Sequence, residues 1–94
     1  MVKIEQDAPG RILVEFSYSA ADADTVALAG NFNDWDPEKY LMTRRNGVFS
    51  LTVALTPGQY EYKFVVDGKW EMDNENPRFT ANDFGTLNSV FEIL

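Results

Sequence analysis

The sequence predicts an all-β fold, a sandwich of antiparallel strands, on two observations. Short runs rich in β-branched and aromatic residues alternate with period two, and turn-forming residues interrupt them about every ten residues. Helical periodicity is weak throughout, and residues 34–40 could hold at most one helical turn. The length of 94 residues suits one domain, and we expect a polar lead-in over residues 1–9 followed by a single domain over residues 10–94.

The first half of the domain is expected to hold three strands before a hairpin. Residues 12–18 alternate, with Ile12, Val14, Phe16 and Tyr18 on one face. Small apolar residues then fill 26–30, the turn-rich stretch 31–37 follows, and a short strand is expected over 40–44. Asn46-Gly47 is a strong hairpin signal.

The second half alternates more regularly. Residues 48–56 form the strand after the hairpin, and Pro57-Gly58 turns the chain into a strand over 59–67. The inward face of that strand carries Tyr60, Tyr62, Phe64 and Val66. A hairpin turn at 67–68, a return strand over 69–72, a long polar loop over 73–85 and a last strand over 87–93 complete the expected fold.

Composition excludes several functions. The net charge is −7, and an acidic surface disfavours nucleic acid and anionic membranes as partners. The chain has no histidine and no cysteine, which removes the commonest general base, thiol chemistry and the usual zinc ligands. No apolar run approaches the roughly 20 residues of a membrane span, and the N-terminus lacks a signal-peptide pattern, so a cytoplasmic protein is expected.

Carboxylates are the remaining candidates for chemistry. Asp34 and Asp36 form one pair, and Glu71, Asp73 and Glu75 form a second group. Glycosidases use two carboxylates across a cleft, but so small a domain offers few walls for one, and we expect solvated loop acids. Residues 73–76 present oxygen ligands, yet they lack the glycine and the distal glutamate of a calcium-binding EF-hand loop. The sequence therefore predicts neither catalysis nor a metal or other cofactor.

The hairpin at residues 67–68 points instead to a binding surface. With a two-residue loop, Val65 pairs with Trp70 and Lys63 with Met72, and paired residues share a face. Because the inward face is already assigned, Trp70 falls beside Lys63 on the outer face. A three-residue loop would turn Trp70 inward instead. Alternatively, Trp70 lies on the outer face but has only a structural role, covering a hydrophobic edge of the sheet. Trp35, in a stretch too polar for a core, is the second exposed candidate, and Phe32 is the better plug for the core.

Two exposed indoles suit a sugar, since pyranose rings present apolar C–H faces to an aromatic ring and hydroxyls to polar neighbours. These residues lie in or near three stretches: 26–35 (VALAGNFNDW), 58–70 (GQYEYKFVVDGKW) and 84–88 (FGTLN). Together these stretches resemble the family 48 carbohydrate-binding modules. That family includes the glycogen-binding domain of the AMP-activated protein kinase β subunit and the N-terminal early-set domains of isoamylases and branching enzymes.

The resemblance implies an immunoglobulin-like, early-set β-sandwich that binds an α-glucan without catalysis. The implied ligands are glycogen, starch, maltooligosaccharide or cyclodextrin, and a glucan-active enzyme or kinase subunit is an implied protein partner. The implied sugar contacts are Trp35, Lys63, Trp70, Phe84, Thr86 and Asn88. The chain departs from the kinase-type domain at Phe84, where that domain has a leucine. The alternatives are an early-set packing or protein-interaction module without sugar binding, and a small hydrolase.

Overall fold

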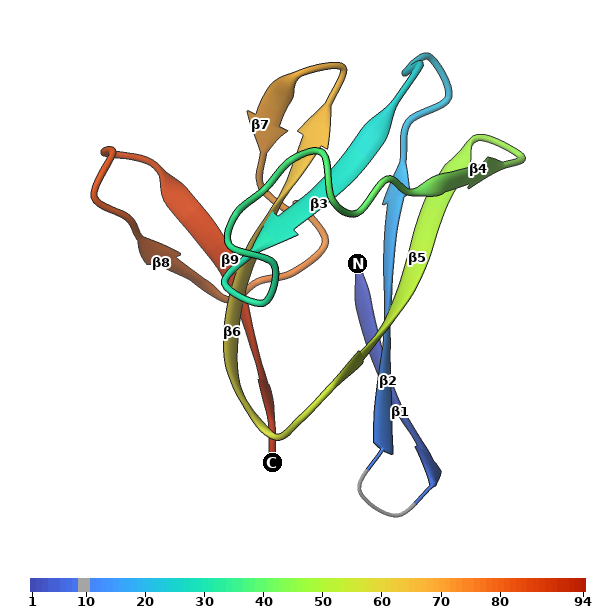
Figure 1. The fold of residues 1–94 in the computed structure, drawn as a ribbon. Coiled ribbons are helices and arrows are strands. Elements are labelled where there is room, and N and C mark those ends of the chain that lie inside the picture. The colour runs from blue at the N-terminus through green and yellow to red at the C-terminus, as the bar shows by residue number, and fades with distance from the viewer. Residues whose placement is uncertain (9–10) are drawn as a thin grey trace.

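The computed structural model describes residues 1–8 and 11–94 and confirms the all-β antiparallel sandwich. Over these residues the strands form two sheets that face each other (Figure 1). Sheet A has the order β1-β2-β5-β4, with β1 (Val2–Ala8), β2 (Arg11–Ser19), β5 (Val48–Leu55) and β4 (Thr43–Arg45). Sheet B has the order β3-β6-β9-β8, with β3 (Val26–Gly30), β6 (Gly58–Val66), β9 (Leu87–Ile93) and β8 (Phe79–Ala81), and β7 (Lys69–Glu71) also pairs with β6. No helix long and apolar enough to cross a membrane occurs in the described part of the chain.

The core lies between the two sheets and uses the inward faces that the alternation predicts. Both β2 and β6 contribute every second residue to it, as expected from the strand period of two. Val14, Phe16, Tyr62 and Phe64 are fully buried there. Phe32 closes one side of this core, as predicted, with its ring stacked on Tyr40 at 6.2 Å between centroids.

Both predicted two-residue hairpins are confirmed. In the turn between β6 and β7, Asp67 and Gly68 have φ angles of 49° and 85°. This left-handed pair is typical of a type I′ turn, which matches the twist of antiparallel strands and favours Asp or Asn followed by Gly. The turn sets Val66 opposite Lys69 and Val65 opposite Trp70. The pairing of β6 with β7 ends at Phe64 and Glu71, so the predicted pairing of Lys63 with Met72 is wrong. On the other side of β6, Lys63 pairs with Ala29 of β3.

Two edge strands, β1 and β8, differ from the prediction. The expected lead-in contains strand β1, in which Val2 pairs with Phe16 and Ile4 with Val14 of β2. The expected loop over 73–85 contains β8, which pairs with β9. Edge strands bond to a single neighbour and bury few side chains, so their hydrophobic alternation is weak. The lead-in's Pro9-Gly10 end lies outside the described residues.

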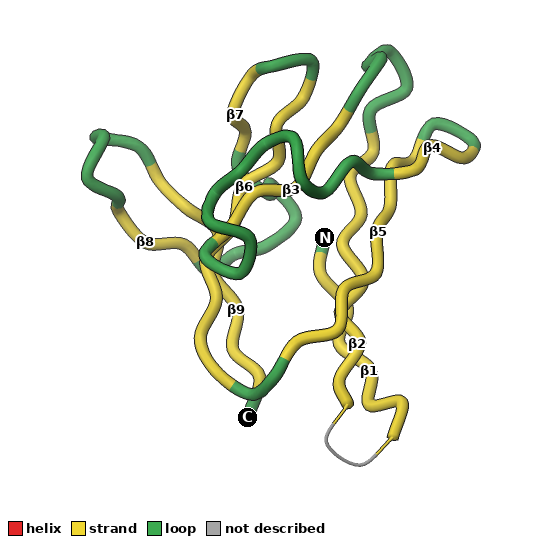
Figure 2. Tube along the Cα trace, viewed as in Figure 1, coloured by secondary structure: helices red, strands yellow, loops and turns green. Residues whose placement is uncertain are grey.

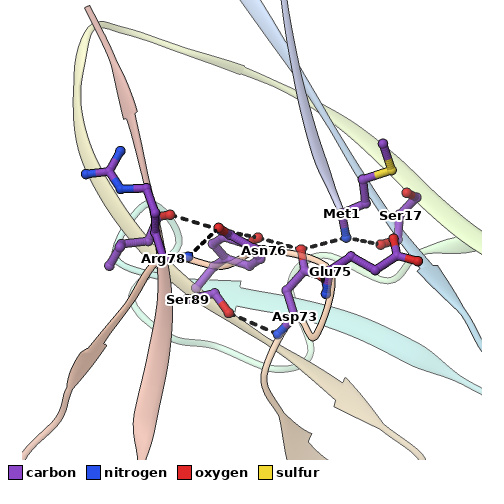
Figure 3. A network of polar contacts seen from close by, with 9 residues as sticks. Met1, Ser17, Asp73, Glu75, Asn76, Arg78 and Ser89 are labelled. Carbon is purple, nitrogen blue, oxygen red and sulfur yellow. Dashed lines mark hydrogen bonds and ion pairs between the residues drawn. The ribbon is translucent and has the colours of Figure 1, made fainter.

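Asp73 also differs from the prediction, because it is buried rather than solvated. Its Oδ2 accepts a hydrogen bond from the Tyr62 hydroxyl at 2.6 Å, and its backbone N–H donates to Ser89 Oγ at 2.9 Å. Figure 3 shows the surrounding network, in which the ammonium of Met1 also contacts Asp73. Burial, and next the bond to Asp73, raises the pKa of Tyr62, which keeps its hydroxyl protonated as a donor. The network fixes the connection between β7 and β8 against β6 and β9.

Candidate functional site

The outer face of sheet B, away from the core, carries a groove of about 720 Å³. A hollow of this size is within the range of small-ligand sites. All of the site residues expected from the resemblance line it: Trp35, Lys63, Trp70, Phe84, Thr86 and Asn88. The groove is also lined by residues that the sequence reasoning did not single out, namely Asn31, Glu61, Ala81, Asn82 and Asp83. Residues from distant parts of the chain therefore meet on one surface.

Trp70 stands on the outer face, as the hairpin argument predicts. Its pairing with Val65 follows from the two-residue turn, and 45% of its surface is exposed. The turn itself is held by Asp67, whose Oδ1 accepts hydrogen bonds from the backbone N–H groups of Asp24 and Thr25 at 2.9 and 2.8 Å. An exposed indole on a short, tethered hairpin is a rigid platform for a flat apolar ligand surface.

Trp35 is placed by the connection of residues 31–42, which runs from the end of β3 to the other sheet (Figure 2). Contrary to the prediction of two exposed indoles, Trp35 is half-buried, and it packs against Ala27, Ala29 and Val65 on the outer face of the sheet. Its φ angle is 56°, and that of Asp34 is 59°. A left-handed conformation is a strained choice for a tryptophan, and such strain persists only where neighbouring contacts enforce it.

The enforcing contacts come from Asn33 and Gly30. Asn33 is buried; its Oδ1 accepts from the Gly30 N–H at 3.0 Å and its Nδ2 donates to the Leu28 carbonyl at 2.9 Å. The Trp35 N–H donates to the Gly30 carbonyl at 2.9 Å. A Cβ at Gly30 would lie 2.4 Å from a ring carbon of Phe32 and 2.6 Å from the Glu61 carbonyl oxygen, so the close approach needs glycine. Sequence reasoning saw Asn33 only as a turn former.

Replacing Asn33 by alanine should therefore destabilise the domain. The change removes the side-chain hydrogen bonds to the Gly30 N–H and the Leu28 carbonyl, which are both buried. A buried polar group left without a partner costs about 1–3 kcal/mol. We expect a loss of roughly 2 kcal/mol in the free energy of unfolding, measured by urea denaturation. Asn33→Asp keeps an oxygen that can accept from the Gly30 N–H but sets a buried carboxylate oxygen against the Leu28 carbonyl, so it should lose at least as much. A urea midpoint for Asn33→Ala equal to that of the parent would contradict this assignment.

Lys63 lies on the outer face, as predicted, but it is 8% exposed rather than free in solvent. Its Nζ donates to Thr86 Oγ1 at 3.1 Å. Asn88 is also buried, and its Nδ2 donates to Glu61 Oε1 at 3.0 Å. These contacts join β6 to the β8–β9 turn and to β9 across the groove floor. Glu61 shares its face with Lys63 by the strand period, and that period was the signal that could have identified it.

Phe84 is the most exposed of the aromatic side chains that line the groove. It lies in the turn between β8 and β9, and 90% of its surface is accessible. Asn82 Oδ1 accepts hydrogen bonds from the backbone N–H groups of Phe84 and Thr86 at 3.0 and 3.1 Å, which shapes this turn. The sequence reasoning missed Asn82 because it treated residues 73–85 as one polar loop.

The groove is chemically suited to a neutral, partly apolar ligand. Aromatic rings stand at several points of its wall, while its charged lining consists of the cation of Lys63 and the carboxylates of Glu61 and Asp83. An anionic ligand would meet more negative than positive charge there. A polyhydroxyl ligand would find both donors and acceptors.

The chain is similar in sequence to parts of two longer proteins. Over 62 residues the chain is 42% identical to Protein PTST homolog 2, chloroplastic, of Arabidopsis thaliana, covering 66% of this chain and 12% of that protein. Over 68 residues it is 37% identical to the 5'-AMP-activated protein kinase subunit beta-1 of Sus scrofa, covering 72% of this chain and 53% of that protein. The chain thus spans only part of the length of these relatives.

A maltogenic amylase from S. marinus shares the fold. Its crystal structure superposes with a TM-score of 0.83 at 22% identity, over 100% of this chain and 16% of the amylase. The family described as the glycogen recognition site of AMP-activated protein kinase matches residues 12–94, nearly the whole chain. The chain therefore belongs to this family of non-catalytic, glycogen-recognising carbohydrate-binding modules.

Proposed function

We propose that the chain binds an α-glucan in the groove on the outer face of sheet B and does so without catalysis. The observation that supports this most is the meeting of two indoles and a hydrogen-bonded polar floor in one open groove. Trp35 and Trp70 stack on pyranose rings, and Phe84 presses against the ligand from the β8–β9 turn. Lys63, Thr86 and Asn88 bind the sugar hydroxyls.

The physical chemistry of this contact predicts weak binding. Covering about 100 Å² of apolar surface on one stacked indole contributes roughly 2.5 kcal/mol, and each neutral hydrogen bond contributes about 1 kcal/mol net. After the cost of association, the dissociation constant falls on the order of 10 μM to 1 mM. The acidic surface, at net charge −7, does not oppose a neutral polymer.

The same proposal defines the class of ligand that the whole protein binds. Glycogen or starch chains are the polymeric ligands, and maltooligosaccharides and cyclodextrins are short analogues of them. The relatives matched include a kinase subunit, and the fold recurs within a maltogenic amylase. We therefore propose that the domain brings a glucan-active enzyme or a kinase complex to its polymer.

Calorimetric titration with β-cyclodextrin tests the function, with a glycogen gel-shift as the second assay. We expect saturable heat with a micromolar to millimolar dissociation constant, and retarded migration in gels that contain glycogen. Cellobiose, whose β-linkage gives an extended shape, is the matched control sugar. An absence of heat and of retardation at millimolar sugar would overturn the proposal and favour a protein-interaction module.

A further inference from the structure

A continuous chain of hydrogen-bonded side chains crosses the groove floor. It runs from β6 to the β8–β9 turn and back: Lys63 Nζ to Thr86 Oγ1 (3.1 Å), Asn82 Nδ2 to Thr86 Oγ1 (2.7 Å), Asn82 Nδ2 to Asn88 Oδ1 (2.9 Å) and Asn88 Nδ2 to Glu61 Oε1 (3.0 Å). Lys63, Thr86 and Asn88 are glucan contacts in the proposed function. Asn82 is the link between them, and it lies at the centre of this chain.

The orientation of the Asn82 amide is fixed by its backbone neighbours. The N–H groups of Phe84 and Thr86 can only donate, so the atom that they reach at 3.0 and 3.1 Å must be the amide oxygen. The amide nitrogen therefore faces Thr86 Oγ1 and Asn88 Oδ1. A primary amide has two donor hydrogens and an oxygen that accepts twice, and all four positions are used here. Asn82 has no hydrogen bond left for a ligand.

The hydrogen bonds of Asn82 determine which hydrogen bond Thr86 can still make to a ligand. Thr86 Oγ1 accepts from Asn82 Nδ2 and from Lys63 Nζ, which occupies both of its lone pairs. Its own proton must then point to another acceptor, and a sugar oxygen in the groove is such a group. At the other end of this row of hydrogen-bonded side chains, Asn88 donates to Oε1 of Glu61. The carboxylate has a second oxygen, so it can still accept a hydrogen bond from a ligand. The floor thus presents donors at Lys63 and Thr86 and an acceptor at Glu61.

We propose that Asn82 is a positioning residue of the glucan site, an inference that rests on the proposed function. Its oxygen shapes the turn that carries Phe84, and its nitrogen fixes the hydrogen-bond direction of Thr86 and Asn88. Removing the nitrogen alone frees the Thr86 hydroxyl to reorient and leaves Asn88 without one partner. Sugar binding must then also order the Thr86 and Asn88 side chains, which are already ordered in the parent, and this cost weakens the affinity.

Asn82→Asp separates the two roles, because a carboxylate keeps the acceptor for the backbone N–H groups and loses both donors. We expect this variant to bind β-cyclodextrin about tenfold more weakly, as expected for one or two lost neutral hydrogen bonds, with a fall in melting temperature of only a few degrees, since its turn keeps both backbone hydrogen bonds. Because the ligand is neutral, the added charge does not itself repel it. Asn82→Ala should weaken binding at least as much and also lower the melting temperature. Asn74→Ala, at an exposed asparagine outside the groove, should bind as the parent does.

A double-mutant cycle with Thr86→Val measures whether Asn82 and Thr86 are coupled in β-cyclodextrin binding. A purely structural role of Asn82 would give no such coupling. If Asn82 acts through Thr86, Asn82→Asp should weaken binding less than about threefold in the Thr86→Val background, because the hydroxyl it orients is gone. Fully additive effects, or an Asn82→Asp variant that binds as tightly as the parent, would overturn the proposal. If the parent itself fails to bind β-cyclodextrin while its turn is intact, the proposed function fails and this inference fails with it.

Discussion

Trp70→Ala should weaken β-cyclodextrin binding about 60-fold while leaving the fold intact. The indole stands on the outer face with 45% of its surface exposed, and it takes no part in the core between the sheets. Its stacking surface accounts for roughly 2.5 kcal/mol of the expected binding free energy, and each 1.4 kcal/mol changes affinity tenfold. Calorimetric titration measures the affinity, and thermal unfolding followed by circular dichroism measures the stability.

Phe79→Ala is the matched control for Trp70→Ala. Phe79 is also a large exposed aromatic residue of sheet B, at 57% exposure on β8, but it does not line the groove. It should bind sugar as the parent does. Loss of binding in both variants would mean that exposed aromatic area in general, and not this groove, holds the ligand. Unfolding of Trp70→Ala would instead show that the indole is structural.

Phe64→Ala should have the largest effect on stability. Phe64 has no exposed surface, and its ring meets those of Tyr18 and Tyr62 edge to face at centroid distances of 4.9 and 5.7 Å. Removing a buried phenylalanine leaves a cavity and costs about 3–5 kcal/mol. For a domain of this size that is a large share of the total stability. Urea denaturation measures the loss, and Phe79→Ala again serves as the surface control.

A Phe64→Ala variant that unfolds at the same urea concentration as the parent would contradict the core assignment. Such a result would require the two faces of β6 to be exchanged. The groove would then lose Lys63 and Glu61 from its floor, because those residues alternate with Phe64 along the strand. Stability and binding are thus linked predictions about opposite faces of a single strand.

The central strands could be predicted from the sequence because each has one strongly apolar face. The alternation of Tyr60, Tyr62 and Phe64 predicts the inward face of β6, and the turn residues Asp67 and Gly68 predict the register that places Trp70. Strands β1 and β8 could not be predicted in this way. They lie at sheet edges, where pairing requires little burial and leaves no clear pattern.

The candidate site was predictable where it depends on motifs and register, and not where it depends on packing between distant segments. Burial of Lys63 follows from its contact with Thr86, which lies 23 residues further along the chain. The left-handed backbone at Trp35 depends on the buried amide of Asn33. The central place of Asn82 becomes visible only once β8 and β9 are paired. Local sequence carries no signal for such contacts.

The most direct test of glucan binding in the groove is a titration followed by the indole N–H signals in NMR spectra. The chain has two tryptophans, and both line the groove, so two indole signals report on it without further labelling. Upon addition of β-cyclodextrin we predict that both signals shift with a common dissociation constant, together with the backbone amides of residues 61–63 and 84–88. Saturable binding that leaves both indole signals unmoved, or no binding at millimolar sugar, would contradict the account.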